Sequence, residues 1–244
     1  MATPVQSTDL QELRRQCLLG ARLLWRELRE LYGHVSCRLP DGSGFLLAMV
    51  RVPPAPLNPD EVLRFDMEGN QLEGNQPPPY ELPMHTEVYR RRPDVAAVVH
   101  SHPHVATALS TAGKTVFALT QQSRMFGTGI PIFRGDFVTD RALGEALAEQ
   151  LGAHVAILLK GHGALTVGRH VPEAVGHMLY LEQAAKQLLW ASIVGTPEPL
   201  PQRLREHRFP EERGLGGGTL NLWRQLLWDW ESGGGPKEPG ALAL

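Results

Sequence analysis

Short apolar runs alternate with helical segments along this chain, and turn sequences interrupt the runs at two places. Residues 95–100, which are rich in valine, and residues 155–159 are each typical of a buried strand. Turn residues at 40–44 and at 68–70 predict two hairpins. Strands joined by hairpins and separated by helices favour a mixed α/β domain over a regular parallel Rossmann sheet.

Other segments carry apolar residues at helical spacing. We expect the first helix to open on a capping box at residues 8–11, to present an apolar face from Leu10 to Leu31, and to stop at Gly33. A further strand is expected at residues 115–119. The remaining expected helices span residues 83–92, 104–111, 139–151, 172–193 and 220–230.

The size and charge of the chain narrow the possible classes of function. Its 244 residues suit one ordinary domain. A formal net charge of −2, without a run of lysine and arginine, argues against nucleic acid or an anionic membrane as a partner. Two cysteines are too few for a disulfide framework, and no apolar stretch approaches the roughly 20 residues needed to cross a bilayer. With no signal peptide recognised, we expect a soluble cytoplasmic protein.

Histidines lie at the end of one expected strand and just after the end of another. His100 and His102 are two residues apart at the end of a strand, so their imidazoles point to the same face. His162 follows the strand at 155–159 and has a glycine on each side, which permits tight turns and close approach of a ligand. If these strands are neighbours, three neutral imidazoles meet, as in a catalytic metal site with an open position. The alternative is that these are unrelated members of a set of ten histidines.

The residues around 81–89 allow two interpretations when they are taken alone. Glu81 follows three prolines and precedes a helix, so it is either a carboxylate that stabilises a helix N-terminus or a functional acid. His85 lies four residues before Tyr89 on the same helix, which suits a core histidine or the wall of a pocket. His104 is expected at the surface, at the start of the next helix.

Several separated motifs, in this order, resemble the class II aldolase/adducin family. Gly-His-Val-Ser begins at Gly33, and residues 81–89 read Glu-Leu-Pro-Met-His-Thr-Glu-Val-Tyr. Val-Val-His-Ser-His-Pro follows at 98–103, and Lys-Gly-His-Gly at 160–163. The resemblance covers residues 9–195. It is specific to the family and much less specific to one reaction.

The resemblance implies an α/β/α sandwich around a mostly antiparallel central sheet, with residues 1–231 as one domain, a C-terminal helix at 218–231, and a disordered tail at 232–244. It implies a homotetramer with sites at subunit interfaces. It also implies that His100, His102 and His162 bind one divalent metal ion per subunit, with zinc first and manganese, iron or cobalt as alternatives. Glu81 would be the catalytic acid/base.

The chain departs from the sugar-phosphate aldolases of this family at several places. Their phosphate loop is replaced by Met-Val-Arg-Val-Pro at residues 49–53, their serines before the glutamate by residues 78–80, and their asparagine by His34. A phosphate needs several donors at once, so a phosphorylated sugar fits poorly. Their tyrosine acid would fall near Gln121, with no tyrosine nearby.

The glycine-flanked His162 motif and a C-terminal segment with Trp223, Trp228 and Trp230 look more like the decarboxylases of the family, which act on ortho-hydroxylated aromatic or pyridine carboxylates. The metal would stabilise the electron-rich ring, and Glu81 would deliver the proton. The partner would then be a small aromatic acid in aromatic compound metabolism. Expected substrate contacts are His34, Ser36 and Gln121, and a substrate carboxylate could be clamped by Arg51, Arg124 or Arg134.

Three other functions stay open on the sequence. The chain could be an aldolase for an unphosphorylated or unusual substrate, an iron-dependent oxygenase, or an adducin-like module without activity. The intact set of Glu81, His100, His102 and His162 argues against the last.

Overall fold

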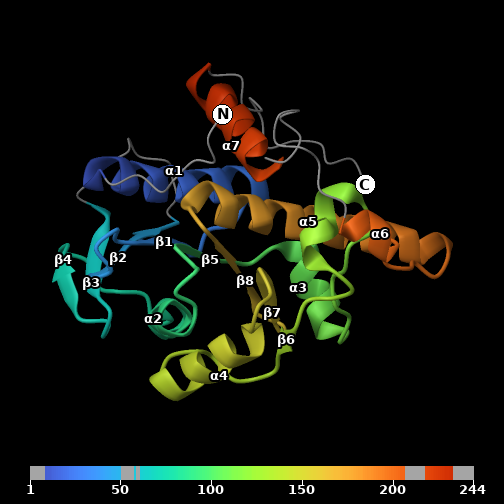
Figure 1. Ribbon diagram of the computed structural model, residues 1–244, viewed down its shortest axis with the longest axis horizontal. Helices are drawn as coiled ribbons and strands as arrows, with labels where there is room; N and C mark the ends of the chain where they lie inside the picture. Colours follow the sequence, from blue (N-terminus) through green and yellow to red (C-terminus); the bar gives the residue numbers. More distant parts are fainter. Residues whose placement is uncertain (1–8, 51–57, 59–60, 207–217, 233–244) are drawn as a thin grey trace.

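The computed structural model describes residues 9–50, 58, 61–206 and 218–232. Their strands form one eight-stranded sheet in the order β4-β3-β2-β1-β5-β8-β7-β6 (Figure 1). Neighbouring strands are antiparallel except for β6 and β7, which are parallel. The strands are β1 (His34–Arg38), β2 (Gly44–Met49), β3 (Leu63–Asp66), β4 (Gln71–Glu73), β5 (Ala97–Ser101), β6 (Ile132–Phe133), β7 (Ala156–Leu159) and β8 (Gly163–Gly168).

Helices cover both faces of this sheet, so the expected α/β/α arrangement is confirmed. On one face α1 (Leu10–Leu28) packs against α5 (Val171–Val194), which also contacts α3 (His104–Thr111) and α7 (Gly218–Glu231). On the other face α2 (Leu82–Arg91) packs against α4 (Arg141–Leu151), below the sheet in Figure 1. The short helices η2 (Gln121–Phe126) and α6 (Gln202–Arg205) lie together near α5.

Alternation along the strands builds two separate apolar cores. In β5, Val99 belongs to the core beneath α1 and α5, and Val98 to the core beneath α2 and α4. His100 has the same parity as Val98 and therefore faces α2. The antiparallel register places His34 of β1 opposite His100 and Ser36 opposite Val98. Three polar side chains thus enter the α2 side of the sheet.

Two local predictions were wrong. The first helix ends at Leu28, where Arg29 adopts a left-handed conformation with φ of 58°, and does not continue to Gly33. Its N-cap is Asp9, whose Oδ1 accepts a hydrogen bond from the Gln11 backbone; Thr8 lies outside the described residues. Residues 115–119 do not join the sheet, because their backbone bonds locally to a loop: Ala118 N donates to Gly127 O, and Ile130 N to Val116 O.

The remaining expected helices begin and end within two residues of their expected bounds. Of the expected tail at 232–244, Ser232 is described as a turn residue after α7, and residues 233–244 lie outside the described residues. Within the described part of the chain, no helix is long and apolar enough to cross a membrane.

Candidate metal centre and acid–base site

The three histidines of the proposed metal group come together at one end of the sheet. His100 lies in β5 and His102 directly after it, and their ring centroids are 4.8 Å apart. His162 lies in the turn between β7 and β8, with its ring centroid 4.9 Å from that of His100. The strand before His162 is not the neighbour of β5, since β8 lies between them. The turn after β7 carries His162 back across this gap.

A glycine permits this close approach. A Cβ atom on Gly163 would lie 2.5 Å from Ser101 O and 3.0 Å from His102 Cδ2. Real Cβ atoms do not tolerate the first of these distances, so a side chain here would push the turn away from β5. Gly163 therefore allows the turn to bring His162 against the other two imidazoles.

The hydrogen bonds of His100 leave one ring nitrogen available. Its Nδ1 lies 3.0 Å from Ala164 O and donates to it, which leaves the lone pair on Nε2. That Nε2 is buried and has no hydrogen-bond partner among the described residues. A buried, unpartnered lone pair beside two further imidazoles is the arrangement expected of a metal ligand.

Glu81 turns its carboxylate into the same cluster. It occupies the N-cap position of α2 but makes no side-chain capping hydrogen bond. Its Oε2 lies 3.3 Å from His100 Nε2 and 3.8 Å from His34 Nε2, and its Oε1 lies 3.4 Å from His162 Nε2. The Oε1 atom is buried without a hydrogen-bond partner in the described structure. Glu81 thus stands at a helix start, as one interpretation expects, but its carboxylate faces the histidines and does not cap the helix.

Lowered pKa values keep the imidazoles of His34, His102 and His162 neutral. Burial lowers the pKa of His34 to about 4 and that of His102 to about 3, and it also lowers the pKa of His162. Burial alone would raise the pKa of Glu81, but His100 and His34 outweigh it and lower that pKa. Neutral imidazoles beside a carboxylate are the protonation states that a divalent cation requires.

Two overlapping groups of side chains could hold a divalent ion. One is His100, His102 and His162; the other is His34, Glu81 and His100. The ligand atoms of each group lie within 4.8 Å of one another. Three imidazoles with an open position fit zinc and other borderline ions. Glu81 lies beside these histidines, where its carboxylate could exchange a proton with a bound molecule.

Two residues beside the cluster were not predicted from the sequence. Glu30, which is buried after the end of α1, places Oε2 3.4 Å from His102 Nδ1 and Oε1 2.6 Å from His104 Nε2. The expected helical continuation to Leu31 concealed this role. The half-exposed Phe137 stacks on His162, with ring centroids 4.6 Å apart and an angle of 17° between the planes. Its loop carries no motif that could have indicated the contact.

The expected substrate contacts occupy different settings. His34 lies inside the cluster, whereas the Ser36 hydroxyl is fully buried and bonds inward to His85 and Tyr89. Gln121 lies on η2, which packs against α5 and α6, and its Oε1 is buried without a hydrogen-bond partner in the described chain. Their contact with a substrate stays a prediction.

The arginine and tryptophan predictions also stay untested. Arg51 lies outside the described residues, Arg134 is exposed, and Arg124 is half-buried on η2. Trp223 is buried on α7 and Trp228 is mostly exposed.

Relatives with known activities match most of the chain. A 3,4-dihydroxyphthalate decarboxylase from Arthrobacter keyseri is 32% identical over 215 residues, which cover 81% of this chain and 84% of the relative. An L-fuculose phosphate aldolase from Methanococcus maripaludis is 34% identical over 132 residues, or 53% of this chain and 70% of the relative. Both relatives are enzymes of the lyase class.

The fold has a solved counterpart as well. The L-fuculose 1-phosphate aldolase from Glaciozyma antarctica PI12 superposes with a TM-score of 0.75 at 20% identity, covering 97% of each chain. The family model of the class II aldolase and adducin N-terminal domain matches residues 15–189. This match, together with the fold and the motifs at 81–103 and 160–163, shows that the chain belongs to the class II aldolase/adducin family.

Proposed function

We propose that this protein is a metal-dependent decarboxylase of an ortho-hydroxylated aromatic or heteroaromatic carboxylate. The observation that carries the proposal is the position of Glu81, whose two carboxylate oxygens lie within 3.4 Å of ring nitrogens of His100 and His162. A carboxylate so close to the expected metal ligands can deliver a proton to the carbon atom that loses carbon dioxide. The 32% identity to a dihydroxyphthalate decarboxylase over 81% of the chain supports this substrate class.

The residues of the chain would divide the chemistry as follows. His100, His102 and His162 would hold the ion, which supplies a Lewis acid for the hydroxyl and carboxylate oxygens of the substrate. Glu81 would take up the proton of the substrate's ortho hydroxyl. When carbon dioxide leaves, the same carboxyl group would hand this proton to the ring carbon, so that a carbon–hydrogen bond replaces the carbon–carbon bond. Phe137 would wall the site beside His162 with an apolar ring.

The phosphate-binding chemistry of the family's aldolases has no counterpart at residues 78–80. Two prolines and Tyr80, whose side chain is 87% exposed, stand where serine hydroxyls would be needed. An uncharged or carboxylated substrate suits the residues at 78–80 better than a sugar phosphate does.

The first experiment measures carbon dioxide released from dihydroxybenzoates, dihydroxyphthalates and hydroxypyridine carboxylates. The zinc- or manganese-loaded protein is compared with chelated protein and with Glu81→Gln. We expect turnover by the loaded protein and loss of turnover in the other two. Glu145→Gln, which changes an exposed carboxylate on α4, is the matched control and should retain activity. Metal-loaded protein that releases no carbon dioxide from any member would contradict the proposal.

A second candidate is aldol cleavage of a hydroxy-carbonyl compound, which the 34% identity to an L-fuculose phosphate aldolase supports. Formation of an aldehyde without carbon dioxide would favour it. The homotetramer and the choice of zinc stay predictions, and mass measurement of the native protein would test both together.

A further inference from the structure

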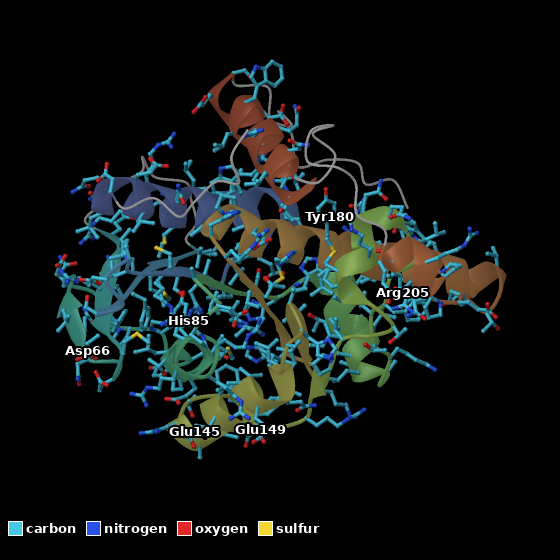
Figure 2. The ribbon with its side chains drawn as sticks, viewed as in Figure 1. Asp66, His85, Glu145, Glu149, Tyr180 and Arg205 are labelled. Atoms are coloured by element: carbon cyan, nitrogen blue, oxygen red, sulfur yellow. The ribbon has the colours of Figure 1, made fainter. Side chains whose placement is uncertain are left out.

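Four polar side chains form a continuous chain of hydrogen bonds beneath the site, between β1 and α2. His34 Nδ1 lies 2.6 Å from His85 Nε2, His85 Nδ1 lies 2.6 Å from Ser36 Oγ, and Ser36 Oγ lies 2.7 Å from Tyr89 OH. None of the four residues is more than 3% exposed. His85 lies on the side of α2 that faces the sheet (Figure 2). The direction of each hydrogen bond is therefore set by these side chains and not by solvent.

The buried end of the chain fixes the direction of the first hydrogen bonds. Ser36 Oγ is the hydrogen-bond partner of the Tyr89 hydroxyl in the described structure, so Tyr89 donates to Ser36. Ser36 has one hydrogen of its own and two acceptors in reach. His85 Nδ1 is 2.6 Å away and Val98 O is 3.5 Å away, so the hydrogen goes to His85.

The two imidazoles pass this direction on to Glu81. A neutral imidazole carries one hydrogen, so His85, which accepts at Nδ1, donates from Nε2 to His34 Nδ1. His34 then carries its hydrogen on Nε2, the atom that lies 3.8 Å from Glu81 Oε2. With the opposite order, Glu81 Oε2 would face nitrogen lone pairs from both His34 and His100, with no hydrogen from either.

We propose that Tyr89, Ser36 and His85 are positioning residues that hold His34 in the tautomer with its hydrogen on Nε2. His34 is then a hydrogen-bond donor in the site and not a metal ligand. The inference rests on the proposed function for its catalytic meaning. It also separates the two overlapping metal groups, because the group of His34, Glu81 and His100 would need a lone pair on His34 Nε2.

The tautomer can be read directly from two-bond proton–nitrogen spectra of the full chain with ¹⁵N-labelled histidine. Comparison with His34→Gln assigns the signals of His34. We expect a hydrogen on Nε2 in the wild-type protein, both without metal and after zinc is added. In Ser36→Ala we expect a mixture of the two tautomers. Ser36→Thr, which keeps the hydroxyl, should restore the wild-type pattern.

Turnover provides a second, separate readout. We expect kcat of Ser36→Ala to fall about tenfold or more, the scale seen when outer-shell partners are removed, with little change in KM. Tyr89→Phe should act in the same direction with a smaller effect, because Ser36 can still donate to His85. Thr166→Val is the matched control: it removes a buried hydroxyl that donates to Ala174 O, outside the chain of hydrogen bonds, and should leave the tautomer unchanged.

Three results would overturn the inference: a hydrogen on Nδ1 of His34 in the wild type, a shift of the His34 Nε2 signal to that of a metal-bound nitrogen when zinc is added, or a Ser36→Ala spectrum identical to the wild type. The spectra need no turnover. Absence of carbon dioxide release would therefore count against the decarboxylase proposal alone and leave the tautomer measurement valid.

Discussion

Glu30 Oε2 lies 3.4 Å from Nδ1 of His102. Glu30 is 8% exposed, and its other oxygen contacts His104. A carboxylate behind a metal-binding histidine fixes the orientation of the ring and increases its basicity. Glu30 is therefore placed to orient His102 toward an ion.

Substitution of Glu30 by glutamine should weaken metal binding. Glutamine keeps the size of the side chain and removes the negative charge, so we expect about a 10- to 100-fold lower affinity for zinc. Competition with a chromophoric chelator measures this affinity. Glu145→Gln on α4 is the control and should bind zinc as the wild type does. Equal affinities for the two variants would contradict a role of Glu30 behind His102.

Removal of the metal should lower thermal stability. A ligand that binds the folded state alone stabilises it, by about 2.7 kcal/mol when the free metal is 100 times Kd. In a domain of this size each kcal/mol changes Tm by roughly 2–4 °C. A chelator should therefore lower Tm of the wild type by several degrees. It should not change Tm of His100→Ala, and an equal decrease in that variant would place the stabilising ion elsewhere.

A methyl group at position 163 should damage both the turn and the site. The Cβ of Gly163→Ala would lie 2.5 Å from Ser101 O, so the turn must move away from β5. We expect a loss of about 1–3 kcal/mol in the free energy of unfolding, together with weaker zinc binding. Urea unfolding and chelator competition measure the two effects. Gly195→Ala, where an added Cβ meets nothing within 4 Å, should change neither.

Glu173 should contribute stability that depends on pH. Burial alone would raise its pKa, but hydrogen bonds from the Arg169 side chain and backbone outweigh it and lower the pKa from 4.5 to about 2. Because the folded-state pKa is the lower one, this contribution is complete above pH 4.5 and is lost as the pH falls through about 2.

Urea unfolding of the wild type and of Glu173→Gln over this pH range tests the contribution. The stability difference between them should be largest near neutral pH and should shrink as the solution becomes more acidic. Arg169→Gln should reproduce part of this loss, because the Arg169 side chain lowers the pKa of Glu173 more than the Arg169 backbone does. A difference that does not vary with pH would show that Glu173 acts through packing alone.

The parts of the site that follow from strand and helix periodicity were predictable. His100 and His102 converge because residues two apart in extended chain share a face, here at the end of β5 and directly after it, and helix α2 lies close to its expected place. Glu30 was not predictable, because its burial depends on the left-handed turn at Arg29, where the helix ends earlier than the apolar spacing indicates. Local sequence does not encode which of two plausible helix ends tertiary packing selects.

The order of the strands in the sheet could not be predicted from the sequence either. The segment Gly163–Gly168 has few large apolar residues, so it gave no strand signal, yet β8 lies between β5 and β7. His100 and His162 therefore meet through the hairpin of β7 and β8, and not because β5 and β7 are neighbouring strands. The chain of His34, His85, Ser36 and Tyr89 likewise depends on the pairing of β1 with β5 and on the docking of α2.

The hairpin of β7 and β8 has a consequence for the order of events during synthesis. A growing chain that has emerged as far as β5 already holds Glu81, His100 and His102. The third imidazole arrives only after β7 has formed and the turn has returned toward β5. Because pairings between distant segments form slowly, we expect the proposed three-histidine group to be complete only after β8 has paired with β5 and β7. A chain that ends before β7 therefore lacks the third imidazole of the proposed metal group.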